Sequence, residues 1–578
     1  MEVVSRQKEE AIKTETRTMS GADAIIYSLI DEGVDYIFGY PGGANMPMYD
    51  SLHRMGDDKI KHILARHEQG AIHAAQGYAR SSGRVGVVFA TSGPGATNII
   101  TGIADAFLDS TPIVCITGQV NASLLGSDAF QETDITGVTS PVTKWNYQLT
   151  KEEEITDIIA KAFYIAKSGR PGPVLVDISK DIQFKDVEYS FEECSYVKSY
   201  VPLPEPKQED IKEAAEAING AKKPMIIYGQ GVILSEAENE LKELIERADI
   251  PAANTLLGIS AIDTEHPNAV GMVGMHGNYA PNILTNSCDV LIAIGMRFDD
   301  RITGDLDRYA KQANIIHFDI DNSEFHKNVK ANITVLGDAK ETLSLMLPLI
   351  NNNEHKSWKQ EFSDLEAEEK KVIWDEILEP TEGDITMAEV VRRVSELTDN
   401  EAIVVTDVGQ HQMFASRYSR FKNTKSFISS GGLGTMGFGL PAAIGAKLGA
   451  PDKQVVCFSG DGGFQMTMQE LGTIMEYGMN VKAIILNNGF LGMVRQWQDL
   501  FFDKRYASTP MKSPDFGKIT DAYGIAYKKV TERDNLLESL KEMLNHDESF
   551  VLEILVKEEL NVFPMVPGGA AVTDVRLK

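Results

Sequence analysis

Residues 455–488 read VVCFSGDGGFQMTMQELGTIMEYGMNVKAIILNN, and this stretch decides the fold class. The apolar runs at 455–459 and 482–486 predict two buried strands, and residues 468–477 between them predict a helix. Because a helical crossover joins parallel strands, we expect the two strands to be neighbours in an open α/β sheet. The GDGG turn and the NN pair then follow the carboxyl ends of the strands, where such sheets bind ligands.

The GDGG turn and the NN pair offer the ligands that Mg²⁺ prefers. Asp461 supplies a carboxylate and Asn488 a carbonyl oxygen, and diphosphate oxygens and water could complete an octahedron. Gly460, Gly462 and Gly463 allow backbone N–H groups to approach a phosphate. An isolated GDG is more often an ordinary strand-to-helix turn, but its spacing from the second polar pair favours a cation held between carboxylate and diphosphate.

The order of strand, Gly-rich turn and helix recurs near the N-terminus, where we expect a strand at 85–90, a turn at 92–95 and a helix at 96–108. Two stretches rich in proline or charge, 190–210 and 351–384, predict linkers. The sequence therefore predicts an α/β protein of three doubly wound parallel-sheet domains. The expected divisions are a flexible tail at 1–18, a first domain at 19–188, a central domain at 205–350, a third domain at 382–560 and a C-terminal tail at 561–578.

The composition narrows the class of protein. Among 578 residues, 84 acidic and 56 basic side chains give a formal charge of −28, which disfavours nucleic acid as a partner. The four cysteines are scattered without a CxxC pair, so neither a zinc cage nor a disulfide framework is indicated. With no secretory signal and no apolar run of membrane-spanning length, the sequence predicts a cytoplasmic protein without a membrane partner.

A second candidate site lies in RHEQGA, residues 66–71. An apolar run at 62–65 predicts a strand, so Glu68 would lie at the start of the following helix. A glutamate in this position is most often a cap or a solvated first-turn residue. Its assignment as a catalytic acid therefore depends on the rest of the sequence.

Together these motifs resemble the thiamine-diphosphate-dependent enzymes. The resemblance implies that Asp461 and Asn488 hold Mg²⁺ through their side chains and Phe490 through its carbonyl. It makes Glu68 the carboxyl that donates to the aminopyrimidine ring, general acid-base work that typically contributes about 10²–10⁴ in rate. It also implies a homodimer, because in this superfamily the pyrimidine-binding first domain and the diphosphate-binding third domain come from different subunits. The other thiamine diphosphate contacts that it implies are Pro41, Gly43, Gln410, His411, Gly434, Met436, Gly460, Gly462, Gly463, Met493 and Val494.

Further segments are similar to the catalytic subunits of biosynthetic acetohydroxyacid synthases, from about Gly21 to Pro567. The segments are PGGA at 41–44, TSGPGATN at 91–98, DAFQE at 128–132, PVTK at 141–144 and GMVRQW at 492–497. This resemblance implies decarboxylation of pyruvate and transfer of the two-carbon fragment to a second pyruvate or to 2-ketobutyrate, in valine, leucine and isoleucine biosynthesis. It also implies a homodimer or homotetramer and a small regulatory subunit.

The resemblance gives a role to RFDDR, residues 297–301, which alone would be a charged surface loop with internal ion pairs. It implies a structural FAD in the central, FAD-associated domain. Its contacts would be Gly229, Gly231, Met275, His276, Gly277, Arg297, Asp300, Asp319 and Asp338. The planar guanidinium of Arg301 would hold the acceptor carboxylate, and Trp497 would shape the pocket for the acceptor's alkyl group. Phe130, Gln131 and Lys144 would line the same funnel. Gln131 and Lys144 would also be catalytic residues, together with Glu68.

Two alternatives stay open at this level. A flavin-using oxidoreductase with the same domains, similar to pyruvate oxidase, would pass the electrons to FAD, although RFDDR, Lys144 and Trp497 argue against it. A binding protein without turnover is the other, although Glu68, Asp461 and Asn488 are intact.

Overall fold

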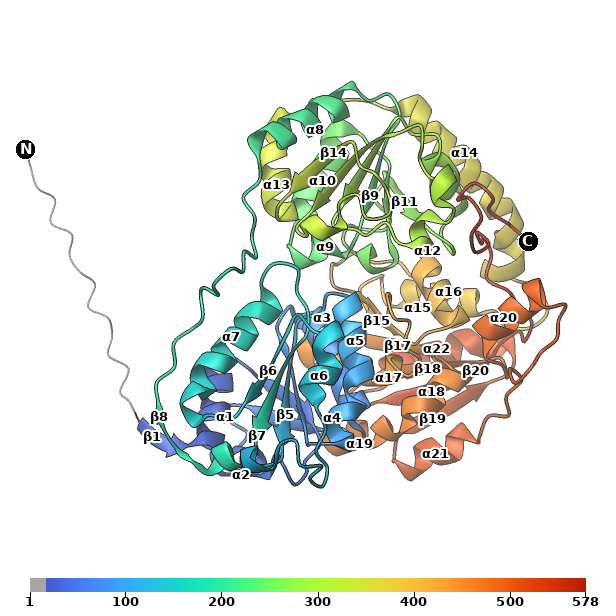
Figure 1. Cartoon of the computed structure of the whole chain (residues 1–578). Helices are drawn as coiled ribbons and strands as arrows, with labels where there is room; N and C mark the ends of the chain where they lie inside the picture. Colours follow the sequence, from blue (N-terminus) through green and yellow to red (C-terminus); the bar gives the residue numbers. More distant parts are fainter. Residues whose placement is uncertain (1–16) are drawn as a thin grey trace, which may run out of the picture.

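The computed structural model describes residues 17–578, without the side chains of residues 374 and 375. Three six-stranded sheets of parallel strands make up three α/β domains. In Figure 1 the first domain (blue and cyan) and the third (orange) lie side by side, with the central domain (green) above them. The predicted fold class is confirmed.

In each sheet the strand order shows that the chain starts at an inner strand and adds strands toward both edges. In the first domain the order is β3 (Lys61–Leu64), β2 (Tyr36–Gly39), β4 (Gly86–Ala90), β5 (Ile113–Gln119), β7 (Val174–Ser179) and β6 (Trp145–Leu149). In the central domain it is β11 (Ala269–Met272), β10 (Ala252–Asn254), β9 (Pro224–Tyr228), β12 (Val290–Ile294), β13 (Asn314–Asp319) and β14 (Ile333–Leu336). In the third domain it is β16 (Phe427–Ser429), β15 (Ile403–Thr406), β17 (Val455–Gly460), β18 (Lys482–Asn487), β20 (Phe550–Leu555) and β19 (Ala526–Val530).

Both faces of the third sheet are buried, which explains its continuous apolar strands. Successive side chains of a strand point to opposite faces. Val405 and Cys457 belong to one apolar core, whereas their neighbours Val404 and Val456 belong to another on the other face. The sheet is therefore covered by helices on both sides, as a doubly wound fold requires.

The stretch that decides the fold forms the expected neighbours. Strands β17 and β18 pair in parallel from Val456 opposite Lys482 to Gly460 opposite Leu486. The expected helix begins as a 3₁₀ turn and continues as α19 (Leu471–Tyr477), but a further helix, α18 (Asp461–Thr467), starts directly after β17. The GDGG glycines therefore lie at the start of a helix rather than in an open turn.

The first and third domains share one apolar core. Helix α3 (Glu68–Ser82) crosses α17 (Gly439–Gly449), and side chains from both sheets join the same cluster. A Cβ at Gly77 would lie 1.9 Å from the Ala442 carbonyl oxygen, and one at Gly445 would lie 1.7 Å from that of Ala74. Only glycine allows the two backbones to approach this closely, so the relative position of the two domains is fixed.

The expected linker at 351–384 contains the long helix α14 (Lys356–Ile373), which packs on α11 (Tyr279–Thr285). Trp358 is buried and donates a hydrogen bond from its ring N–H to the Pro224 carbonyl at 2.8 Å. The apolar stripe of this helix is hidden among many charged residues, and for that reason the sequence suggested a linker. The other expected linker has no helix or strand from 190 to 207.

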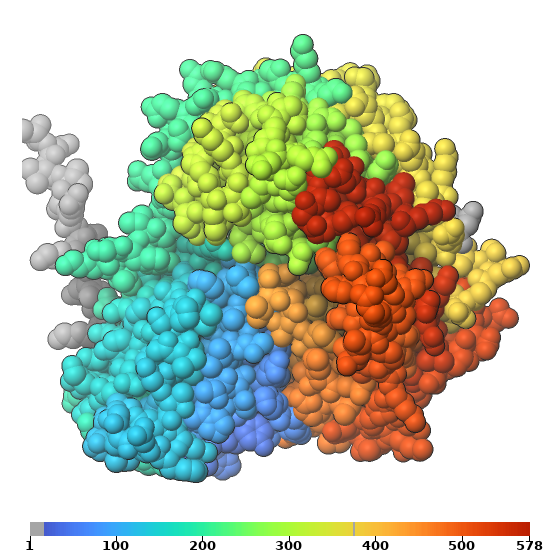
Figure 2. All heavy atoms as spheres, turned by 45° about the vertical axis from the view of Figure 1, so that its right-hand side comes forward, coloured from blue at the N-terminus to red at the C-terminus, as the bar shows by residue number. Residues whose placement is uncertain are grey.

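The C-terminal segment at 561–578 is packed against the domains rather than free. Val562, Met565 and Ala571 are buried, and Asp574 pairs with Arg308 of the central domain at 2.9 Å. Figure 2 shows this segment (dark red) between the central domain and the end of the third. Most of the tail expected at 1–18 lies outside the described residues. Within residues 17–578, no helix is both long and apolar enough to cross a bilayer.

Candidate functional site

The third domain buries a carboxylate at the carboxyl end of strand β17. Asp461 is the first residue of α18 and is fully buried. Its Oδ2 accepts a hydrogen bond from the Ser513 hydroxyl at 2.8 Å, whereas its Oδ1 has no hydrogen-bond partner. Burial raises the pKa of this carboxyl, and the Ser513 hydrogen bond opposes the rise. A buried carboxylate oxygen without a partner is available to a divalent cation.

The two asparagines after strand β18 differ in their partners. Asn487 donates to Glu553 Oε1 at 2.7 Å and so ties the end of β18 to β20. The Asn488 side chain is buried, with its nitrogen 3.4 Å from Gln410 Oε1 and its oxygen 3.2 Å from the Phe490 backbone nitrogen. Of the pair, only Asn488 lines the neighbouring cavity.

A small cavity of about 40 Å³ is lined by Asn488 and by Gly460 and Gly462, the two neighbours of Asp461. Burial lowers the pKa of His411 to about 3, so the ring is neutral, and its Nε2 is buried without a partner. His411, in the wall of the cavity, thus leaves one buried polar atom without a partner, and Asp461, whose neighbours Gly460 and Gly462 line the cavity, leaves another. A bound anion and its counter-ion would supply such partners. Ten predicted residues line the cavity, namely Gln410, His411, Met436, Gly460, Gly462, Gly463, Asn488, Phe490, Met493 and Val494.

The side chain of Gln410 differs from the expectation that it reaches the diphosphate. Its nitrogen donates to Gln496 Oε1 at 2.9 Å and to the Leu560 carbonyl oxygen at 2.8 Å, so both N–H groups are used. Its oxygen faces the Asn488 amide. In this structure Gln410 orients Asn488, and its own backbone N–H, at the start of helix α16 (Gln410–Tyr418), is the group left to contact a ligand.

The first domain holds Glu68 at the carboxyl ends of its strands. Glu68 is half-buried, and its Oε2 accepts a hydrogen bond from the Asn98 amide at 3.0 Å. A Cβ at Gly95 would lie 3.2 Å from Glu68 Oε1, so the glycine leaves the carboxylate room. The backbone of Gln131, at φ +60°, lies over Gly93 in the same turn. Glu68 and Gln131 are thus brought together around one Gly-rich turn.

The PGGA segment completes this group. Ala44 donates its backbone N–H to the Thr91 hydroxyl at 3.2 Å, while Pro41 and Gly43 are exposed. No first-domain residue lines the small cavity of the third domain. One chain therefore carries two separate parts. The acid half-site comprises Pro41, Gly43, Glu68 and Gln131, and the phosphate half-site comprises Asp461, Asn488, His411 and the small cavity.

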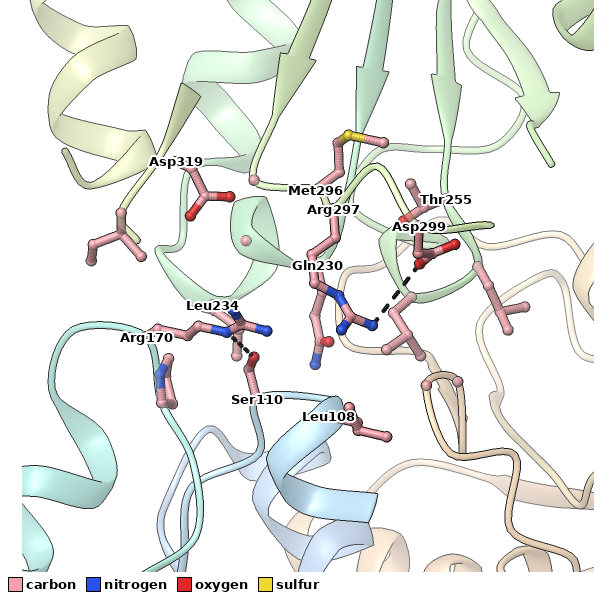
Figure 3. A pocket seen from close by; sticks show the side chains of 18 of the residues that line it. Leu108, Ser110, Arg170, Gln230, Leu234, Thr255, Met296, Arg297, Asp299 and Asp319 are labelled. Atoms are coloured by element: carbon pink, nitrogen blue, oxygen red, sulfur yellow. Dashed lines mark hydrogen bonds and ion pairs between the residues drawn. The ribbon is translucent and has the colours of Figure 1, made fainter. Parts of the chain in front are cut away.

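A larger cavity of about 580 Å³ lies where the three domains meet (Figure 3). Leu108 and Ser110 reach it from the first domain, Arg297 and Asp319 from the central domain, and the segment 431–434 from the third. Its volume is in the range of pockets for large cofactors. Burial raises the pKa of Asp319 to about 7, and the Asp321 backbone N–H, a hydrogen-bond donor to Asp319, opposes the rise.

The expected flavin contacts divide into two sets. Gly231, Arg297, Asp300, Asp319 and Asp338 line the large cavity. Gly229, Met275, His276 and Gly277 do not belong to its lining. Arg301, which does line it, bridges the two sets, because its guanidinium lies 3.8 Å from the Met275 sulfur. Gly434, expected at the thiamine site, lines the large cavity instead.

The expected substrate funnel is only partly assembled. Phe130 is 87% exposed, and Arg301 lies in the lining of the large cavity. The Trp497 ring is tilted against that of Phe501, with 5.0 Å between ring centres. Within residues 17–578, no hydrogen bond, ion pair or ring contact joins any two of these three side chains. The three residues remain expectations for the acceptor site.

Lys144, expected in the funnel, has three hydrogen-bond partners of its own in this chain. Its ammonium donates to the carbonyl oxygens of Ile165, at 2.5 Å, and Ser168, at 2.8 Å, at the end of helix α7 (Ile155–Lys167). A third hydrogen bond goes to the Tyr200 hydroxyl at 3.0 Å. Burial lowers the pKa of Lys144 to about 8. All three N–H donors are used by the end of helix α7 and by Tyr200 of the segment after the first domain, so Lys144 caps helix α7 in this structure.

Two residues near the sites could not be predicted from the sequence. Ser513 holds Asp461 from a segment 52 positions away, and Arg170 donates to Ser110 at 3.0 Å at the large cavity. Neither belongs to a motif whose chemistry is evident locally. Only the tertiary contacts show them.

Models of three protein domains match successive parts of the chain. They are the N-terminal TPP binding domain of thiamine pyrophosphate enzymes at residues 19–138, the central domain at 211–346 and the C-terminal TPP binding domain at 407–554.

Curated relatives match nearly the full length. The acetolactate synthase large subunit of Lactococcus lactis subsp. lactis is 43% identical over 559 residues, 96% of either chain. That of Haemophilus influenzae is 44% identical over 571 residues, 97% of this chain and 98% of the relative. The isozyme 2 large subunit of Escherichia coli is 44% identical over 561 residues, 96% and 99% respectively. The chain therefore belongs to the thiamine pyrophosphate enzymes, in the family of the acetolactate synthase large subunits.

Proposed function

We propose that the chain decarboxylates pyruvate and joins the two-carbon fragment to a second pyruvate or to 2-ketobutyrate, the acetolactate synthase reaction that opens branched-chain amino-acid synthesis. The observation that carries the proposal is the phosphate half-site. A buried imidazole nitrogen in the wall of a cavity and a buried carboxylate oxygen on the residue between two glycines of that wall both lack partners. The chain that carries them aligns over 96% of its length with an acetolactate synthase large subunit.

The phosphate half-site fits thiamine diphosphate and Mg²⁺. Asp461, Asn488 and the Phe490 carbonyl would hold the cation, because carboxylate and amide oxygens are its preferred ligands. The neutral His411 ring and the backbone N–H groups of the GDGG segment would bind the diphosphate. When bound, thiamine diphosphate supplies the electron sink for decarboxylation. The protein contributes orientation and exclusion of water.

In the acid half-site, Glu68 would hold a proton against the pyrimidine ring of the cofactor. Its position at the start of α3 is fixed by the Asn98 amide, so one carboxyl oxygen is oriented and the other faces the Gly-rich turn. Gln131 lies over the same turn and would line the path of the substrate. Positioned general acids of this kind contribute about 10²–10⁴ in rate.

The two half-sites support a homodimer as the smallest active unit, because neither completes the other within one chain. Apolar side chains next to them are exposed, namely Phe130 at 87%, Met46 at 51% and Val494 at 47%. Such exposure suits a covered interface. We also propose a small regulatory subunit, since the relatives are named large subunits, and a cytoplasmic location, which suits the four unpaired cysteines.

The large cavity fits FAD by volume and by its charges. Arg297 and Arg170 reach it from two domains and could face a pyrophosphate, while Asp319 and Asp338 could accept hydrogen bonds from hydroxyl groups. At the same cavity, the Arg301 side chain is 63% exposed, which leaves its guanidinium able to bind an acceptor carboxylate. Trp497 would shape the space for the alkyl group of that acceptor.

The test is a product assay. The purified chain is incubated with pyruvate, thiamine diphosphate, Mg²⁺ and FAD, and acetolactate, acetyl phosphate and oxygen are measured together, with 2-ketobutyrate as a competing acceptor. We expect acetolactate without matching oxygen uptake. Stoichiometric oxygen consumption or acetyl phosphate would instead assign the chain to flavin-dependent oxidation, and absence of CO₂ release would point to a binding protein.

A further inference from the structure

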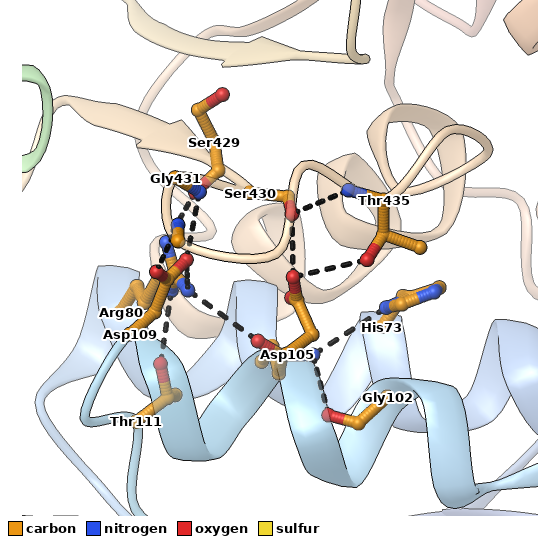
Figure 4. Close-up of polar contacts among 12 residues, drawn as sticks. His73, Arg80, Gly102, Asp105, Asp109, Thr111, Ser429, Ser430, Gly431 and Thr435 are labelled. Atoms are coloured by element: carbon orange, nitrogen blue, oxygen red, sulfur yellow. Dashed lines mark hydrogen bonds and ion pairs between the residues drawn. The ribbon is translucent and has the colours of Figure 1, made fainter. Parts of the chain in front are cut away.

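Two buried aspartates of the first domain grip a glycine-rich segment of the third (Figure 4). Asp105 lies in helix α5 (Ile100–Leu108) and accepts hydrogen bonds from the hydroxyls of Ser430 and Thr435, the latter at 3.1 Å. Asp109, which ends the helix, accepts from the backbone N–H groups of Gly431 at 2.8 Å and Gly432 at 2.6 Å. The carboxylates therefore bind both ends of a short segment, Ser430–Thr435.

Arg80 of helix α3 completes the contact from the first domain. Its guanidinium donates to Asp109 at 2.8 Å and to the Ser429 carbonyl oxygen at 2.5 Å. Asp109 is thus paired with a guanidinium, whereas within residues 17–578 Asp105 has no ion pair and its Oδ2 is buried without a hydrogen-bond partner. Burial and the neighbouring Asp109 charge raise the pKa of Asp105. Burying a carboxyl group with an unpaired oxygen costs free energy, and no contact within helix α5 offsets that cost.

The gripped segment lies between the two cavities. Residues 431–434 line the large cavity, and Met436, directly after the segment, lines the small one. The segment is closely packed. A Cβ at Gly431 would lie 2.8 Å from the Leu257 side chain, and one at Gly432 would lie 2.9 Å from Leu108 Cβ. A shift of Ser430–Thr435 would therefore move the walls of both cavities together.

We infer that Asp105 and Asp109 are positioning residues that fix the Ser430–Thr435 segment and, through it, set the affinities of both cavities for their ligands at once. Neither carboxylate lines either cavity, so both act through the segment. The inference rests on the proposed function for the identity of the two ligands, FAD and thiamine diphosphate. The mobility of the segment itself can be measured without either ligand.

The experiment compares Asp105→Ala with Asp105→Asn in the full chain. Asparagine keeps an oxygen for the two hydroxyls, whereas alanine removes both hydrogen bonds. In the cofactor-free protein, we expect hydrogen exchange of the amides at 430–436 to rise about tenfold in Asp105→Ala and to stay near the wild-type rate in Asp105→Asn. Dissociation constants for FAD and for Mg²⁺-thiamine diphosphate should both rise by about tenfold in the alanine variant only.

Asp177→Ala is the matched control. Asp177 is equally buried, but its partners Thr117, Gln119 and Gln148 all belong to the first domain. This variant should leave exchange at 430–436 unchanged. If Asp105→Ala does not fold, Thr435→Val and Ser430→Ala remove the same hydrogen bonds from the other side, each with an expected effect of about threefold. Thr435→Val is the cleaner of the two, because the Ser430 hydroxyl also accepts a hydrogen bond from the Thr435 backbone N–H at 2.8 Å.

Unchanged exchange at 430–436 in Asp105→Ala and in the two hydroxyl variants would overturn the inference, and so would a rise in only one of the two dissociation constants. A wild-type chain that binds no FAD would instead contradict the proposed cofactor. In that case the exchange rates and the thiamine diphosphate affinity still decide whether Asp105 fixes the segment.

Discussion

The acid half-site and the phosphate half-site differ in how far one chain completes them. In the phosphate half-site Asp461 is fully buried, and Ser513 and Gln410 hold Asp461 and Asn488 from fixed positions. In the acid half-site Glu68 is half-buried and Pro41 and Gly43 face solvent. The difference is the one that the proposed homodimer predicts, with the phosphate half-site arranged within one chain and the acid half-site completed by a second. It also suits the proposed chemistry, because binding a diphosphate and a cation needs several fixed dipoles, whereas the acid needs one carboxyl in one place.

The largest effect is expected for Glu68→Gln, which alters the acid half-site alone. Glutamine keeps the length of the side chain and an oxygen for Asn98 but cannot transfer the proton, so kcat should fall by about 10²–10⁴-fold. Binding of Mg²⁺, thiamine diphosphate and FAD should stay near the wild-type values, measured by titration calorimetry and flavin fluorescence. A variant with near-normal kcat would remove Glu68 from the chemistry.

The second largest effect is expected for substitutions in the phosphate half-site. Asp461→Asn removes the charge of the buried ligand, so the Mg²⁺-dependent affinity for thiamine diphosphate should fall by about 10²-fold or more. Ser513→Ala removes only the hydrogen bond to Asp461 and should cost about tenfold. The two dissociation constants, measured across a Mg²⁺ series, check the order. An Asp461 variant that saturates at wild-type Mg²⁺ concentrations would contradict its place as a ligand.

Mixing the two inactive variants tests whether the half-sites meet across a dimer. If Glu68 of one chain serves the phosphate half-site of another, co-refolded Glu68→Gln and Asp461→Asn chains form heterodimers with one intact site out of two. With random pairing, about a quarter of the wild-type activity should return. Each variant alone is the control. A mixture no more active than its components would mean that both half-sites act within one chain.

The smallest effect concerns Lys144, which the structure assigns to helix α7 rather than to the acid half-site. Lys144→Met should lower the thermal midpoint while kcat and KM stay within about threefold, because the lost hydrogen bonds go to the end of helix α7 and to Tyr200. Burial lowers the folded pKa of Lys144 to about 8, below its ordinary 10.5. Between these values the unfolded chain holds more protons, so Lys144 makes stability rise with pH from about 8 to 10.5.

Denaturant unfolding of both proteins at pH 8, 9 and 10 measures this rise, which should be smaller in Lys144→Met. A loss of kcat without loss of stability would return Lys144 to the chemistry.

The fold could be predicted because its signals are local. Strands β17 and β18 are continuous apolar runs with a helix between them, and that pattern fixes parallel neighbours without knowledge of any contact. Helix α14 could not be predicted in the same way. Its buried apolar side chains are few among charges, and two of them, Trp358 and Phe362, become part of a core only because the central domain packs against them.

The residue types in the candidate site followed from the sequence, but their partners did not. The spacing of GDGG and NN determined that Asp461 and Asn488 lie at neighbouring strand ends, since strand direction and crossover leave no other arrangement. The tertiary structure alone decided that Gln410 turns its side chain to Asn488, that Lys144 caps helix α7 and that Asp105 reaches Ser430. These contacts join residues from 21 to 325 positions apart. Local periodicity carries no information on such pairs, because packing of the domains brings them together.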